Sequence, residues 1–316
     1  MTKKITRRSF IKDSTVIGVG TLVGAGLMNS FSGADYTLYA GDAVDIAAVQ
    51  GEDYFKNTMK AVELLGGMKR FVPKNAKVAI LANPQRNNPG AYTKPELLSA
   101  VIRLCKEAGA KDTACISWQE MKSWENTGLK EVVDKEGARL VIVNLRDESL
   151  FKAVPVPKGK ALKEARIMKE LYEYDLWINL PITKDHAGNK FTGTLKNLMG
   201  LNSPMSNRSF HKPNWKTDLN DIRHLDQSIA DLNTVIAPAL CVVDATEFII
   251  TNGPFGPGTL HKPMQVVAGI DRVAVDAYCC TLWGLEPKDI FHITQAYEHK
   301  LGQMDLKKLN IKKVLA

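Results

Sequence analysis

The stretch that decides the fold reads KVAILAN at residues 77–83, KDTACIS at residues 111–117 and RLVIVN at residues 139–144. Each run is short, and the first and third are largely apolar. The first run ends at an Asn-Pro pair, which is typical of a strand running into a loop. These three runs therefore predict three strands.

Helical patterns separate the three runs. Thr93 is expected to cap a helix that has Pro95 in its first turn and ends at Gly109. Residues 120–136 are expected to be mostly helix. Strands that alternate with helices at this spacing indicate a parallel, doubly wound sheet.

The same alternation continues toward the C-terminus. We predict an α/β fold with a doubly wound, mostly parallel sheet, helices on both faces and a long central insertion. The sequence shows no internal repeat and no low-complexity linker, so residues 35–316 are expected to form a single domain. The further predicted strands cover residues 175–180, 239–244 and 265–270, and the further predicted helices cover residues 162–173, 218–236 and 273–283.

Residues 1–34 have the pattern of a twin-arginine (Tat) signal peptide. Arg7 and Arg8 stand in TRRSFIK, ahead of a weakly apolar stretch at residues 16–28 that is too short to cross a bilayer as a helix. Small residues favour cleavage after Ala34 or after Ala40. The sequence thus predicts contact with the Tat translocase during export, a periplasmic location and no stable transmembrane segment in the mature protein.

The net charge of +8 does not indicate a nucleic-acid partner. Residues 1–34 contribute half of it, and the remainder of the chain holds 37 basic and 33 acidic residues. Nucleic-acid binding favours basic residues clustered with aromatic ones, and no such cluster is present in the mature sequence. We therefore expect no nucleic-acid partner.

The five cysteines give no metal-binding motif. No C-x-x-C pair is present, so an intrinsic iron–sulfur cluster is not expected. Cys241, Cys279 and Cys280 lie in apolar runs and are expected to be small buried hydrophobes. A disulfide between Cys105 and Cys115 is left open for an oxidising compartment.

The first candidate site lies in residues 180–204. Lys184 and His186 directly follow a predicted strand, and Lys196 and Asn197 stand where a short helix is expected to begin. Ligands of open α/β sheets bind outside the carboxyl ends of the strands. Lysines and helix-start N–H groups suit a carboxylate or phosphate, and His186 suits proton transfer or metal binding.

Two aspartates are the metal-binding candidates. Asp244 ends a predicted strand ahead of NGPFGPG at residues 252–258, which is expected to be a rigid turn around a site. Asp276 lies in an apolar helix, where a carboxylate is either functional or paired, for example with Lys184 or Lys196. His211 is expected to be inert on a surface loop.

Four segments in order, NLPITKDH, TGTLKNLMG, VVDATE and DRVAVDA, resemble the domain-of-unknown-function family numbered 362. The resemblance covers roughly residues 75–290. It places the family's Lys-x-His pattern on Lys184 and His186, its Lys-Asn pair on Lys196 and Asn197, and its acidic positions on Asp244 and Asp276. Some family members carry a cysteine-rich ferredoxin-type module, and this chain departs from them by having no such motif.

Two functions fit these observations. The favoured one is a periplasmic enzyme that acts on an anionic small molecule, with Lys184 and Lys196 binding the anion and His186 moving protons. A divalent metal at Asp244 and Asp276 is part of this hypothesis. The alternative is a non-catalytic ligand-binding or accessory protein of a periplasmic redox complex. Nucleophile-elbow, Walker and dinucleotide motifs do not occur.

Overall fold

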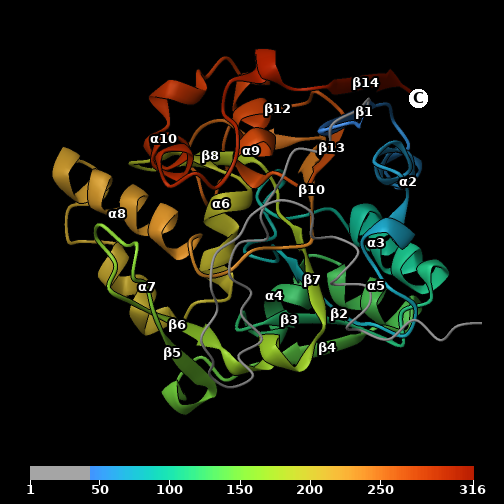
Figure 1. The fold of residues 1–316 in the computed structure, drawn as a ribbon, viewed down its shortest axis with the longest axis horizontal. Coiled ribbons are helices and arrows are strands. Elements are labelled where there is room, and N and C mark those ends of the chain that lie inside the picture. Colours follow the sequence, from blue (N-terminus) through green and yellow to red (C-terminus); the bar gives the residue numbers. More distant parts are fainter. Residues whose placement is uncertain (1–42) are drawn as a thin grey trace, which may run out of the picture. The chain divides into compact units, whose positions relative to one another are not determined.

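The computed structural model describes residues 43–316, so the predicted signal peptide lies outside the described residues. An eight-stranded sheet has the order β14-β1-β13-β10-β7-β2-β3-β4 (Figure 1). All neighbouring strands are parallel except that β13 runs antiparallel to both β1 and β10. The bounds are β1 Ile46–Gln50, β2 Lys77–Ala82, β3 Asp112–Ser117, β4 Arg139–Ile142, β7 Leu176–Leu180, β10 Leu240–Ala245, β13 Gln265–Gly269 and β14 Ile311–Leu315.

Helices cover both faces of this sheet, which confirms the predicted doubly wound α/β fold (Figure 1). Alternate side chains of β2 enter different cores: Val78 and Ile80 pack with α2 (Tyr54–Leu64), α3 (Pro95–Ala108), α4 (Met121–Asn126) and α5 (Leu129–Lys135). Ala79 and Leu81 pack with α8 (Leu219–Leu232), α9 (Arg272–Thr281) and α10 (Phe291–Glu298). Burying each large aliphatic side chain stabilises the fold by about 1.5–3 kcal/mol.

The long insertion between β7 and β10 supplies the small elements nearest the site. The hairpin of β8 (Lys184–His186) and β9 (Lys190–Thr192) leads into α6 (Thr194–Asn197), which α7 (Pro204–Phe210) and α8 follow. A second short ladder joins β11 (Phe248–Ile249) to β12 (Leu260–His261) after β10. One-turn 3-10 helices occupy Met68–Arg70, Glu148–Leu150, Lys169–Glu173, Leu198–Gly200, Pro287–Asp289 and Leu306–Lys308.

The prediction of a helix over residues 162–173 is wrong. Residues Glu164–Met168 form β6, which pairs antiparallel with β5 (Phe151–Pro155), and only Lys169–Glu173 turn as a 3-10 helix. Ala165 and Ile167 are buried while their neighbours Glu164 and Arg166 are exposed, which is the period of a strand. Pairing with β5 overrides a local composition that favours helix.

Two local details also differ from the predictions. The residue that caps α3 is Lys94, not Thr93, and the Thr93 hydroxyl instead accepts from the Asn83 N–H at 3.2 Å and donates to the Leu180 carbonyl at 2.9 Å. Thr93 thus ties the ends of β2 and β7 together. The predicted helix over residues 120–136 is divided by Gly128, whose φ of 73° favours glycine.

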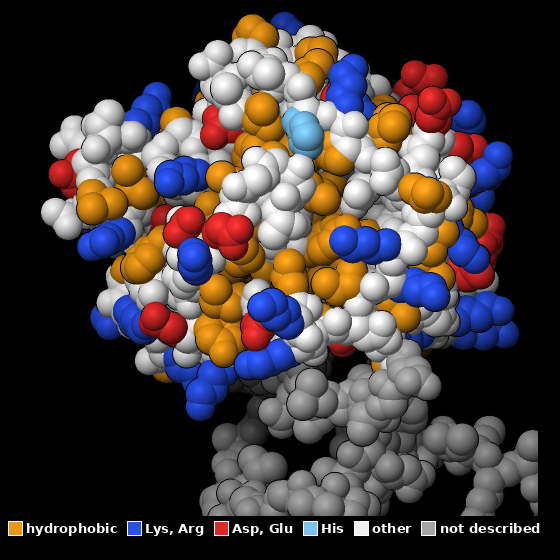
Figure 2. Space-filling model, turned by 90° about the horizontal axis from the view of Figure 1, so that it is seen from above, with side chains coloured by type: hydrophobic (Ala, Val, Ile, Leu, Met, Phe, Trp, Pro, Cys, Tyr) orange, Lys and Arg blue, Asp and Glu red, His pale blue; other side chains and the backbone are white. Residues whose placement is uncertain are grey.

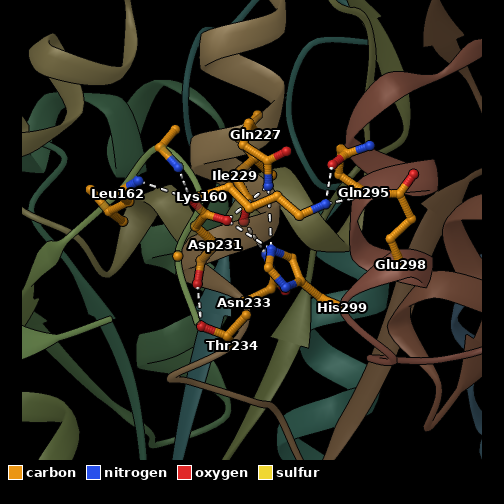
Figure 3. A network of polar contacts seen from close by, with 12 residues as sticks. Lys160, Leu162, Gln227, Ile229, Asp231, Asn233, Thr234, Gln295, Glu298 and His299 are labelled. Carbon is orange, nitrogen blue, oxygen red and sulfur yellow. Dashed lines mark hydrogen bonds and ion pairs between the residues drawn. The ribbon is translucent and has the colours of Figure 1, made fainter. Parts of the chain in front are cut away.

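A buried cluster around Asp231 of α8 joins three separate segments (Figure 3). Its carboxylate accepts from the N–H groups of Ala161 and Leu162 at 2.6 and 2.8 Å. It also accepts from Gln227 Nε2 and contacts His299 Nε2, both at 2.8 Å. The Asp231 cluster therefore fastens the β5–β6 loop to α8 and to the end of α10.

Neither the surface charges nor the cysteines mark a site among the described residues. On the face drawn in Figure 2, basic and acidic side chains are interspersed with apolar ones. No helix within residues 43–316 combines the length and the apolar character that a membrane span requires. All five cysteines are buried and free, so Cys105 and Cys115 do not form a disulfide in this structure.

Candidate functional site

A cavity of about 240 Å³ lies at the carboxyl ends of β2 and β3. This is the position at which open α/β sheets bind ligands. None of the described residues that line it is acidic. Its wall combines one lysine, two histidines, several amides and aromatic rings, contributed among others by Asn83, Gln85, Trp118, His186, Lys196, Asn197, Asn207, His211, Trp215 and Phe255.

Lys196 of α6 places a buried ammonium group at the cavity wall. Its side chain belongs to a residue only 7% exposed, and the one partner found for Nζ among the described residues is Sδ of Met199 at 3.7 Å. Burial lowers the pKa of Lys196 to about 8, and the negative charge of Asp226 limits that fall. At pH 7 the group is therefore a cation that has no oxygen or nitrogen acceptor among the described residues.

His186 ends β8 and presents a neutral imidazole to the same cavity. Its Nδ1 lies 2.8 Å from the carbonyl oxygen of Ala187, which can only accept, so Nδ1 carries the hydrogen. Burial, assisted by the positive charge of Lys196, holds the pKa of His186 well below its ordinary value. The remaining nitrogen, Nε2, is consequently free to accept a proton.

The structure places His211 in the cavity wall and not on a surface loop, while the expectation that it is inert stays a prediction. Its Nδ1 lies 2.9 Å from the Asn207 carbonyl, which fixes the same tautomer as in His186. The two imidazole centroids are 6.2 Å apart, and Trp215 contacts both rings. Burial, and secondarily the charge of Lys196, lowers the pKa of His211 to about 4.

Lys184 does not line the cavity but lies behind its wall. Its fully buried Nζ donates to the carbonyl of Ala91 at 2.6 Å and to Oε1 of Gln85 at 3.1 Å. Burial, with a smaller effect from Lys196, lowers the pKa of Lys184 to about 7. Because Gln85 lines the cavity, Lys184 positions a wall residue rather than meeting a ligand directly.

Asn197 lines the cavity, but its amide is used within the protein. Nδ2 donates to Oδ1 of Asn179 at 2.8 Å and to the Leu81 carbonyl at 3.2 Å. Oδ1 accepts from Nδ2 of Asn83 at 3.3 Å. This chain of amides crosses from β2 to β7 and α6 and holds Lys196, the neighbour of Asn197, in place.

The carboxylate of Asp276 binds the N–H groups at the start of α6, which the sequence suggested for a carboxylate or phosphate ligand. It accepts from the Thr194 N–H at 2.5 Å and the Leu195 N–H at 2.9 Å, the first turn of α6. A Cβ on Gly193 would lie 2.3 Å from Oδ1 of Asp276, so glycine permits this approach. The expectations that α6 offers free N–H groups, and that Asp276 pairs with Lys184 or Lys196, are therefore wrong. Burial raises the pKa of Asp276 to about 6.

Asp244 has a similar structural role at the start of α3. One carboxylate oxygen accepts from the Lys94 N–H at 2.8 Å, and the other accepts from the N–H and hydroxyl of Thr246. Burial raises its pKa. Neither Asp244 nor Asp276 lines the cavity, and within residues 43–316 no group of three or more His, Cys, Asp or Glu side chains could hold a metal. Their assignment as metal ligands stays a prediction.

The glycine-rich turn at residues 252–258 packs on β8 and brings Pro254 and Phe255 to the cavity. The Gly253 N–H donates to Oδ2 of Asp185 at 2.7 Å. A Cβ on Gly253 would lie 1.8 Å from the Asp185 carbonyl oxygen, so only glycine fits here.

Sequence reasoning found His186, Lys196 and Asn197 at the cavity but missed His211, Trp215 and the aromatic wall. The signal that was present is FHKPNW at residues 210–215, which places a histidine between aromatic residues in a polar segment. The arrangement as a whole offers one buried cation for an anion and two uncharged imidazoles for proton transfer.

Fold and cavity together define an α/β protein with a cavity at the carboxyl edge of its sheet. Residues 77–281 match the family described as Domain of unknown function (DUF362), and the chain belongs to that family. It is 27% identical over 248 residues to the thylakoid-associated protein sll1697 of Synechocystis sp., covering 76% of this chain and 73% of that protein.

Two solved structures show weaker similarity. The lactate racemase apoprotein from Thermoanaerobacterium thermosaccharolyticum matches with a TM-score of 0.43 and 16% identity over 70% of this chain and 55% of that one. A protein from Thermotoga maritima matches with a TM-score of 0.40 and 14% identity over 61% of this chain and 51% of that one. The chain thus spans about half the length of both structures.

Proposed function

We propose that the protein is an enzyme that binds a small molecule carrying a carboxylate or phosphate group and moves a proton on it. The observation that carries this proposal is the buried ammonium of Lys196, which faces the cavity without an oxygen partner among the described residues. A buried charge is costly unless it is paired. An anionic ligand supplies the missing partner.

In this proposal Nε2 of His186 accepts the proton. The imidazole is a weak base while the cavity is empty, partly because Lys196 is positively charged. An anion bound at Lys196 offsets that charge and raises the pKa of His186. Ligand binding and the basicity of His186 are therefore coupled.

Mass spectrometry of protein purified from its native host tests the binding step. Small molecules released by denaturation are compared between the wild type, Lys196→Met and a matched control, Lys212→Met, at an exposed lysine. A charge-assisted hydrogen bond stabilises by about 1.5–3 kcal/mol, so Lys196→Met should lower the affinity roughly 10- to 100-fold. Equal ligand content in all three proteins would refute the anion site.

The released ligand then separates an enzyme from a binding protein. The wild type should convert it, and His186→Asn should bind it with an affinity within about threefold of the wild type but not convert it. Binding without conversion by the wild type would favour the alternative of a non-catalytic or accessory protein. Repeated co-purification of a redox subunit would point in the same direction.

Affinity for the anion should fall as the pH rises above about 8. Lys196 loses its proton through that range, and the neutral amine no longer attracts an anion. The bound anion itself raises the pKa of Lys196, so the loss extends to higher pH than in the empty protein. Isothermal titration between pH 7 and pH 10 measures this dependence, and Lys196→Met should be insensitive to pH there.

We also propose that residues 1–34 direct Tat export to the periplasm, with cleavage after Ala34 or Ala40. Support comes from the paired Arg7 and Arg8 and the short apolar stretch that follows them. The double variant Arg7→Lys, Arg8→Lys should remain in the cytoplasmic fraction. The charge-matched control Lys3→Arg, Lys4→Arg should still be exported, and export of both variants would contradict the proposal.

A further inference from the structure

Three large aromatic side chains converge on the cavity from segments that are far apart in the sequence. Trp118 follows β3, Trp215 precedes α8, and Phe255 lies in the turn after β11. Phe255 is 43% exposed although it belongs to the wall of a cavity. Aromatic surface that remains open at a concave site is typical of ligand binding.

Phe255 and Trp215 are held in place by neighbouring groups. The Arg86 guanidinium lies 5.1 Å from the Phe255 ring centroid, and Asn88 Nδ2 donates to the Phe255 carbonyl at 2.6 Å. Trp215 is held between His186 and His211, with centroid distances of 5.2 and 4.8 Å. A preformed wall of this kind lowers the entropic cost of binding.

The polar part of the cavity restricts the ligand further. Lys196 supplies one positive charge, the described lining residues supply no negative charge, and the other polar groups there are neutral. The volume of about 240 Å³ lies below the range of about 300–1,000 Å³ that drug-sized ligands occupy. A small ligand with one anionic group and a flat apolar body matches both the Lys196 ammonium and the aromatic wall.

Building on the proposed function, we propose that the ligand is an aromatic monocarboxylate. Its carboxylate pairs with Nζ of Lys196, and its ring packs against Trp215 and Phe255. The two indoles and the phenyl ring favour a planar ring over an aliphatic one because stacked and edge-to-face contacts add to the burial of apolar area.

Isothermal titration with three sodium salts tests this ligand class. Benzoate carries the proposed ring, cyclohexanecarboxylate has the same number of carbons without a flat ring, and acetate has the anion alone. Benzoate should bind at least about 10-fold more tightly than acetate. The affinity for benzoate should also be at least about threefold higher than the affinity for cyclohexanecarboxylate.

Variants at Phe255 separate the ring from the anion. Phe255→Ala should weaken benzoate about 5- to 10-fold while acetate changes less than about twofold. Phe255→Leu, which keeps most of the apolar volume, should weaken benzoate less. Tyr297→Ala removes an aromatic side chain that is 40% exposed on α10 and is the matched control, for which no change is expected.

The outcomes distinguish this inference from the proposed function. If acetate binds as tightly as benzoate and both depend on Lys196, the aromatic ligand class is wrong and the anion site stands. The aromatic ligand class is also wrong if Phe255→Ala and Phe255→Leu weaken the binding of benzoate and of acetate by the same factor. If Lys196→Met leaves the binding of every salt unchanged, the anion site itself is refuted.

Discussion

The Asp231 cluster and the Lys196 cavity are both buried and charged, yet they differ in how their charge is satisfied. Asp231 receives four polar contacts between 2.6 and 2.8 Å from three segments of the chain. Lys196 has a single weak contact to sulfur among the described residues. Burial of a charge alone therefore does not mark a ligand site, whereas burial without a partner does.

Removing the satisfied charge should produce the largest effect. Asp231→Ala leaves the N–H groups of Ala161 and Leu162 without an acceptor and removes the carboxylate partner of Gln227 and His299, so we expect the free energy of unfolding to fall by about 3–5 kcal/mol. Urea denaturation measures this change. The control Asp134→Ala breaks an exposed helix pair with Lys130 and should cost about 0.5 kcal/mol or less. Equal effects of both substitutions would remove the distinction between the clusters.

Removing the unsatisfied charge should have the opposite sign. Lys196→Met replaces a buried ammonium by an apolar side chain of similar length, so the free energy of unfolding of the empty protein should rise by about 1–3 kcal/mol at pH 7. Lys212→Met, at an exposed position, should change it by about 0.5 kcal/mol or less. A loss of stability in Lys196→Met would show that a partner within the protein already satisfies this lysine.

The smallest predicted effect is a dependence of stability on pH. The folded protein releases the Lys196 proton near pH 8, whereas the unfolded chain keeps it to about pH 10.5. Below pH 8 the charged form destabilises the fold fully, and this penalty disappears as the pH rises toward 10.5 because the unfolded state then binds more protons. From pH 7 to pH 9 the titration of Lys196 should raise the free energy of unfolding by about 1 kcal/mol.

Urea denaturation at several pH values in that range checks this gain, with Lys196→Met as the reference. Lys184, whose pKa is lowered to about 7, contributes with the same sign in both proteins. Because Lys196 also contributes to the lowered pKa of Lys184, the difference between the two proteins reports Lys196 together with this smaller effect. If the free energy of unfolding changes with pH in the same way in the wild type and in Lys196→Met, the lowered pKa of Lys196 is contradicted.

The sequence predicted the central strands well, because each is buried on both faces and appears as a continuous apolar run. It failed at residues 164–168, where a strand depends on pairing with β5 and the local composition favours helix. It also missed β1, which lies next to the edge strand β14, and the helix α2.

The candidate site was predicted in part for a similar reason. His186 directly follows a predicted strand and Lys196 stands where a short helix was expected to begin, so both could be found from position alone. Asp244 and Asp276 have the right residue type at the right positions, but their backbone partners at Lys94 and Thr194 are determined by tertiary packing. His211 reaches the cavity through the fold of the insertion, which no local pattern encodes.

The attachment of the Gly253 turn to β8 has an evolutionary consequence. The turn carries Phe255, while β8 carries His186, and the hydrogen bond from Gly253 to Asp185 holds the two segments together. If the proposed function holds, a substitution at position 255 would change the wall that meets the ligand without displacing His186. Ligand preference would then change by one side chain while Gly253 and His186 are kept.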